Sequence, residues 1–109
     1  MALANFTPTG YGYLVAPSPA PNAYSLAAAV QATAALPGGG GVTLIVTNAG
    51  PSAAAVLLYA VAGGVPTVTP LNGIVVAPNT SENLAVGSND HIAAIGLQSN
   101  AQLSLCQGA

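Results

Sequence analysis

Glycine and proline interrupt this chain so often that long helices have little room. Its 109 residues include 13 Gly and 9 Pro. Turn-forming pairs such as Gly63-Gly64, Pro78-Asn79 and Ser99-Asn100 separate short apolar segments. Apart from the first 36 residues, these segments are 42–48, 53–61, 65–69, 73–77, 82–86, 91–98 and 101–107. Short segments at this spacing are typical of a sandwich or a small barrel, and a count of about eight strands favours an all-β, single-domain, jelly-roll-like β-sandwich.

The segment 23–36, AYSLAAAVQATAAL, is compatible with two structures. Its alanines favour a helix, but its larger apolar side chains also alternate, as in a strand. In a strand, Leu26, Val30 and Leu36 share one face with three alanines, and Gln31 and Thr33 lie on the other. We favour the strand, because the segments that follow have β-like patterns.

The segment 1–22 differs from the rest of the chain. It contains four prolines and two glycines, Gly10 and Gly12. Proline spacing of this kind excludes a helix and favours an extended arm or an edge segment. We therefore divide the chain into an extended N-terminal arm, residues 1–22, and a β-sandwich, residues 23–109.

The near absence of charge excludes several classes of partner. The chain has no Lys or Arg, two acidic residues and one His, with a formal net charge of −2. Nucleic-acid binding depends on cationic side chains that displace counterions from phosphates, and attraction to anionic lipid depends on them too. No apolar run approaches the roughly 20 residues of a spanning helix. We expect neither nucleic acid nor membrane as a partner, and the weak colloidal repulsion favours self-association.

The ionisable side chains gather in a short stretch, NTSENLAVGSNDHIAAIG, residues 79–96. It holds Glu82, Asp90 and His91, and Cys106 follows later. A two-carboxylate glycosidase, a Cys–His nucleophile pair and a zinc site each draw on these few groups, but none has the spacing or supporting residues of such a site. We expect no enzyme activity, no catalytic residue, no metal and no cofactor. The turn-rich flanks instead predict two strands joined by a polar turn, with the ionisable groups on a solvated rim.

Tyrosines are the best candidates for partner contact, because they combine a large apolar area with a polar tip. Tyr11 and Tyr13 alternate around Gly12, so both lie on one face if this segment is a strand. Together with Tyr24 they form the predicted contact set. Tyr59 is the fourth tyrosine, and the alternative role of all four is packing in the core or at a sheet edge.

Three stretches resemble small structural proteins of tailed bacteriophages. Residues 34–59 run through LPGGGG, a strand that ends in TNAG, and a strand of small apolar residues. GIVVAPNTSENLAV, residues 73–86, is similar to their turn segment, and HIAAIGLQSNAQLSLCQG, residues 91–108, is similar to their closing strand pair. Together the match covers residues 34–108.

The resemblance implies a capsid decoration, or cement, protein. Such proteins have β-sandwich or jelly-roll folds, form homodimers or homotrimers, and bind the major capsid protein on the outer surface of the virion head. They reinforce contacts between capsomers. The alternative is a ligand- or carbohydrate-binding β-sandwich module of a phage fibre or another surface structure.

Overall fold

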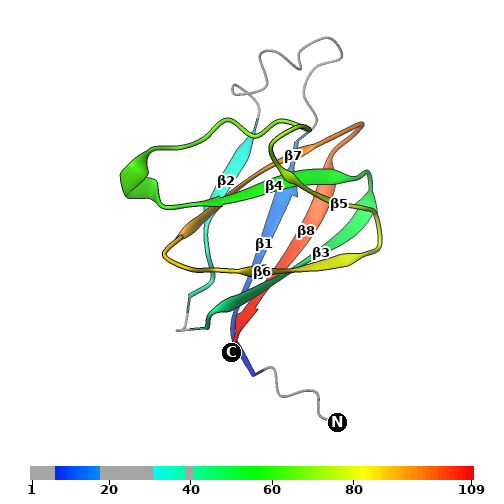
Figure 1. The fold of residues 1–109 in the computed structure, drawn as a ribbon. Helices are drawn as coiled ribbons and strands as arrows, with labels where there is room; N and C mark the ends of the chain where they lie inside the picture. Colours follow the sequence, from blue (N-terminus) through cyan, green and yellow to red (C-terminus); the bar gives the residue numbers. More distant parts are fainter. Residues whose placement is uncertain (1–6, 18–30, 39–40) are drawn as a thin grey trace.

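The computed structural model describes residues 7–17, 31–38 and 41–109. They form two antiparallel sheets of four strands each (Figure 1). The first sheet contains, in spatial order, β1 (Pro8–Ala16), β8 (Ala101–Gly108), β3 (Thr43–Pro51) and β6 (Ser81–Ala85). The second contains β2 (Ala32–Ala35), β7 (His91–Gly96), β4 (Ala54–Tyr59) and β5 (Ile74–Val76). The predicted all-β sandwich of eight strands is confirmed.

The strand pairing is that of a jelly roll. β1 pairs with β8, β2 with β7, β3 with β6 and β4 with β5, so the chain forms a nested antiparallel ribbon. Folding this ribbon over the core adds the contacts of β3 with β8 and of β4 with β7. Apart from β4 and β5, strands that are consecutive in sequence belong to different sheets, as two Greek keys require.

The core lies between the sheets and is aliphatic. Alternation along each strand turns every second side chain inward, and in β8 the inward Leu103 and Leu105 alternate with exposed Gln102 and Ser104. The cluster of buried side chains is Leu14, Ala16, Leu44, Val46, Ala54, Val56, Val76, Val86, Ile92, Ala94, Ala101, Leu103 and Leu105. With no Trp and one Phe in the chain, branched aliphatic packing fills this space.

The ambiguous segment 23–36 is a strand where the structure describes it. Residues 32–35 form β2 and pair with β7. Ala32, Ala34 and Leu36 pack against the core, and Thr33 is exposed, which confirms the alternation over these residues. Residues 23–30 lie outside the described part.

Residues 8–16 of the N-terminal segment form a strand of the first sheet. β1 pairs with β8 along its whole length, with a bulge between Pro8 and Gly10. Next to it, Thr7 and Ala109 exchange two backbone hydrogen bonds of 2.7 and 3.0 Å, so β1 begins beside the C-terminus (Figure 1). This part of the predicted arm therefore belongs to the sandwich.

The predicted strand at 65–69 is wrong. These residues form no strand; they belong to a loop, residues 60–73, that we call the cover loop. Pro66 has no N–H for a ladder, and the N–H of Val68 donates to the Gln31 side chain (2.8 Å). The short 3-10 helix η2 (Val61–Gly63) lies at the start of the loop and extends from one side of the sandwich (Figure 1).

Candidate functional site

Asp90 and His91 make a side-chain contact within the sequence stretch 79–96. The Asp90 Oδ1 and His91 Nδ1 atoms are 2.8 Å apart, and both side chains reach solvent. The same Oδ1 accepts a 2.9 Å hydrogen bond from the N–H of Val61. The His91 ring stacks at an angle on Tyr59, with 5.5 Å between centroids. The arrangement ties the start of the cover loop to the end of β4 and the start of β7.

The contacts of Asp90 favour its charged form. The hydrogen bond from His91, followed by that from the Val61 N–H, lowers the pKa of Asp90 below its usual value of 3.8. A carboxyl group whose pKa is lowered by folding stabilises the folded state above the pKa of the unfolded chain. This contribution disappears as the pH falls through the lowered pKa.

We expect Asp90→Asn to reduce stability at neutral pH but not in strong acid. The amide loses the charge that attracts His91 and the Val61 N–H. Because the wild-type carboxylate is itself protonated in acid, urea midpoints of wild type and variant should converge once the pH falls below 3.8 and through the lowered pKa. A gap that persists unchanged through this window would contradict the assignment.

The structure does not bring the other reactive groups to this pair. Glu82 lies on β6 in the first sheet, whereas His91 begins β7 in the second. Cys106 lies on β8, which pairs with β1 and β3 and not with β7. Among the described residues, no group of three His, Cys, Asp or Glu side chains is placed to hold a metal ion.

The polar turn between residues 85 and 91 therefore connects two sheets. The sequence predicts two strands joined by this turn, and β6 and β7 are indeed consecutive, but they do not pair with each other. Glu82 and Asp90 are exposed and His91 is partly exposed, as expected for a rim. Leu84, Val86 and Ile92 contribute to the core between the sheets. Ile95 is fully buried in a second apolar cluster, so all four bury apolar surface as expected.

The outer face of the first sheet carries two of the predicted contact residues. Tyr11 is 75% and Tyr13 60% exposed, and both point away from the core on β1. Val15, two residues further along β1, points to the same face and is 41% exposed. The segment is a strand, and the two tyrosines share one of its faces, as the alternation around Gly12 implies for a strand. Tyr24 lies outside the described residues.

The strand register places uncharged residues of β8, β3 and β6 beside the two tyrosines. We call this surface the tyrosine face; it consists of two rows of residues that run across the sheet. Tyr11 lies opposite Cys106, which lies opposite Ile45 and then Asn83; the next row is Tyr13, Ser104, Thr47 and Ser81. The hydroxyls of Thr47 and Ser81 are 2.8 Å apart. Glu82, between Ser81 and Asn83, alternates to the inner side, so neither row contains a charged side chain.

The alternation in AQLSLCQ indicates that Ser104 and Cys106 share a face. Sequence reasoning nevertheless missed the residues that complete the tyrosine face. No local signal gives the neighbours of β8, because its partners β1 and β3 come from distant parts of the chain. The face can therefore be assembled only from the sheet register.

The cover loop packs against the outer face of the second sheet and buries apolar side chains there. Val68 is fully buried on the outer face of the second sheet, in a cluster with Ala55, Tyr59, Ala93 and Ile95. Leu57 and Leu97 pack against this cluster. The second sheet thus has a small apolar cluster on its outside as well as the main core on its inside.

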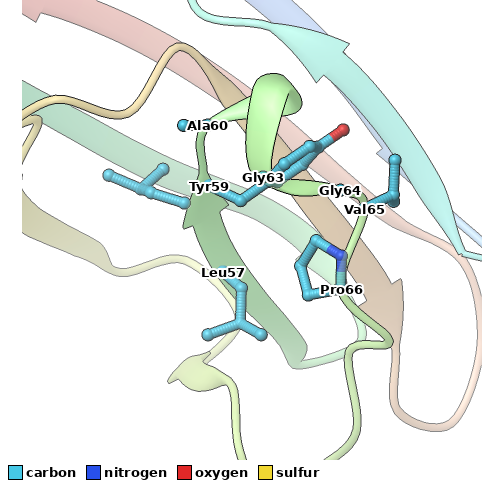
Figure 2. A pocket seen from close by; sticks show the side chains of 8 residues that line it. Leu57, Tyr59, Ala60, Gly63, Gly64, Val65 and Pro66 are labelled. Carbon is cyan, nitrogen blue, oxygen red and sulfur yellow. The ribbon is translucent and has the colours of Figure 1, made fainter.

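An open hollow of about 430 Å³ lies beside this cluster (Figure 2). Its lining contains aliphatic groups, glycines and one tyrosine, and no ionisable side chain of the Asp, Glu or His type. The residues are Leu57, Leu58, Tyr59, Ala60, Gly63, Gly64, Val65 and Pro66. A hollow of this chemistry lacks the convergent polar groups that orient a sugar or a reacting substrate.

Comparisons with protein-family models, with curated proteins and with solved structures found no match. Within the described residues, no helix is long and apolar enough to span a membrane. The tyrosine face is the part of the described surface that bears most directly on function.

Proposed function

We propose that this chain is a non-enzymatic structural protein of a virion. In this proposal it binds the major capsid protein on the outside of a tailed-phage head and reinforces the contacts between capsomers. The observation that carries the proposal is the tyrosine face, an exposed, uncharged sheet surface with two aromatic side chains along one edge.

Such a face is suited to a persistent protein contact. A tyrosine side chain supplies about 150–250 Å² of area, and Tyr11 and Tyr13 leave more than half of theirs in water. The neighbouring hydroxyl, amide and aliphatic groups of Thr47, Asn83 and Ile45 provide hydrogen-bonding and packing partners without a charge to desolvate.

The fold is compatible with this role but does not decide it. Jelly rolls occur in viral capsid proteins and also in lectins and cupins, so function has to be argued from the surface. The virion assignment rests on the resemblance of residues 34–108, in turn residues and alternation, to small structural proteins of tailed phages. The alternative of a carbohydrate-binding module has less support, because the lining of the hollow offers one polar side chain, that of Tyr59, and no second one that would help to orient a sugar.

Co-sedimentation with undecorated heads tests the proposal. We expect saturable binding, and we expect the double variant Tyr11→Ser/Tyr13→Ser to weaken it by about 30-fold or more, as for central interface aromatics. The matched control is Val65→Ser/Leu71→Ser, because these side chains are 56% and 96% exposed on the cover loop. Absence of saturable binding by the wild type, or equal losses in both double variants, would contradict the proposal.

Salt dependence gives a further expected outcome. Neither row of the tyrosine face carries a charge, and the chain has no Lys or Arg. Salt therefore has few charges to screen at this contact. Between about 50 and about 500 mM NaCl, the affinity for heads should change by less than about two-fold. A steep fall in affinity with salt would show that ionic contacts dominate.

A further inference from the structure

The four edge strands of the two sheets differ in how well they are protected against pairing with another chain. An edge strand exposes backbone N–H and C=O groups that can pair with another chain. Proteins prevent such pairing with short edge strands, charged side chains or proline. β2 has four residues, β5 has three and β6 has five. β1 has nine residues, and its one described strand partner is β8 on the other side.

β6 carries a protective charge that β1 lacks. Glu82 lies opposite the buried Val46, so its side chain points to the inner side of an edge strand while remaining exposed. An inward-pointing charge at an edge disfavours the approach of a second strand, because pairing would bury it. The sequence of β1, PTGYGYLVA, has no charged residue, and its proline is the first residue, where it interferes least.

From these differences we infer that β1 pairs antiparallel with β1 of a second copy of this chain. The pairing joins two first sheets into one eight-stranded sheet across a two-fold axis. Antiparallel pairing of identical strands is self-complementary, as a two-fold interface requires. The interface brings together no like charges, because neither the strand nor its face has any.

The length and alternation of β1 indicate the register. The strand from Pro8 to Ala16 is centred on Gly12, so a two-fold axis at Gly12 pairs Gly10 to Leu14 of the two copies, the part of the strand beyond the irregularity between Pro8 and Gly10. Tyr11 then lies opposite Tyr13 of the second copy, and Tyr13 opposite Tyr11. Aromatic pairs directly opposite each other stabilise antiparallel sheets, and this register places both pairs on the outer face.

The dimer would present four tyrosines as one continuous strip on the tyrosine face. Two linked copies of a contact surface bind a repeating lattice more tightly than either copy alone. The inference thus deepens the proposed function and rests on it for its biological role. Its test needs no capsid, so dimerisation and head binding can fail separately.

The test is the molar mass of the purified chain by light scattering and sedimentation over a concentration series. We expect about twice the 10.4 kDa chain mass for the wild type. We expect Tyr13→Lys to weaken dimerisation by about ten-fold or more, because it removes both tyrosine pairs and adds a charge to each copy. Circular dichroism would verify that the variant is folded, which its exposed position favours.

Two matched variants separate the β1 edge from other contacts. Ser81 and Thr47 lie in the same row as Tyr13, at the opposite edge and within the sheet. Ser81→Lys and Thr47→Lys should leave the dimer intact. A monomeric or trimeric wild type would overturn the inference. Dissociation by Thr47→Lys as strong as that by Tyr13→Lys would also overturn it, since it would indicate packing of sheet faces.

Discussion

Replacing Asn48 by alanine is expected to lower the free energy of unfolding by about 3–5 kcal/mol. Asn48 is fully buried on β3. Its Nδ2 donates to the carbonyls of Ser52 (2.8 Å) and Val76 (3.0 Å), and its Oδ1 accepts from the Gly50 N–H (2.7 Å). Alanine leaves three buried backbone groups without these partners, and each unsatisfied group costs about 1–3 kcal/mol.

Thr47→Ala is the control for this change. Thr47 is the preceding residue, but its hydroxyl bonds to Ser81 at the surface, where loss of a hydrogen bond costs about 1 kcal/mol or less. Urea unfolding followed by circular dichroism measures both variants. Equal losses in the two variants would contradict the view that Asn48 holds β3, the following turn and β5 together.

Val68→Asp is expected to destabilise the chain by about 3 kcal/mol or more, because it places a carboxyl group in an apolar cluster without a compensating partner. Val68 is fully buried against the outside of the second sheet. The rest of the cover loop is held by Gln31, whose Nε2 donates to the Pro66 carbonyl (2.7 Å), and by Asn72, whose Oδ1 accepts from the Thr69 N–H (2.8 Å).

Val65→Asp tests whether burial, and not the mere presence of an acid in the loop, causes the loss. Val65 lies three residues earlier and is 56% exposed, so its replacement should change stability by less than about 0.5 kcal/mol. Thermal melts would measure the loss of stability. Faster hydrogen exchange of the Ala93 and Ile95 amides would show that the cover loop no longer packs on the second sheet. Similar effects of the two substitutions would contradict a packed cover loop.

Sequence patterns predicted the local elements of this fold better than their assembly. Alternation along 101–107 predicts β8, and the turn residues Ser99-Asn100 lie directly before its start, whereas Gly63-Gly64 lies inside the cover loop, beyond the end of β4 at Tyr59. The segment VPTVT alternates equally well but forms a loop, because Pro66 lacks a donor and Gln31, a residue distant in sequence, takes the Val68 N–H. Periodicity alone does not distinguish these cases.

The candidate site was predictable only in part, for the same reason. The alternation of Tyr11 and Tyr13 around Gly12 is local, and it correctly placed them on one face. Their neighbours Cys106, Ile45 and Asn83 come from three other strands, and a long-range register assembles them. Asn48 reads as a turn residue in TNAGP, whereas the fold buries it and uses its amide to join two strands.

The three ionisable side chains near residue 90 illustrate the difference between proximity in sequence and in space. Asp90 and His91 meet because they are adjacent, but the jelly-roll connection sends Glu82 to the other sheet. The stretch therefore marks the crossing between the two sheets, where the chain leaves β6 and enters β7.

The most direct test of the proposed role is an electron cryo-microscopy map of phage heads incubated with the chain, compared with untreated heads. We predict added density on the outer surface, fitted by the jelly roll with Tyr11 and Tyr13 turned toward the capsid shell. Heads without added density at saturating protein, or density attached through the cover loop with the tyrosine face in solvent, would contradict the account.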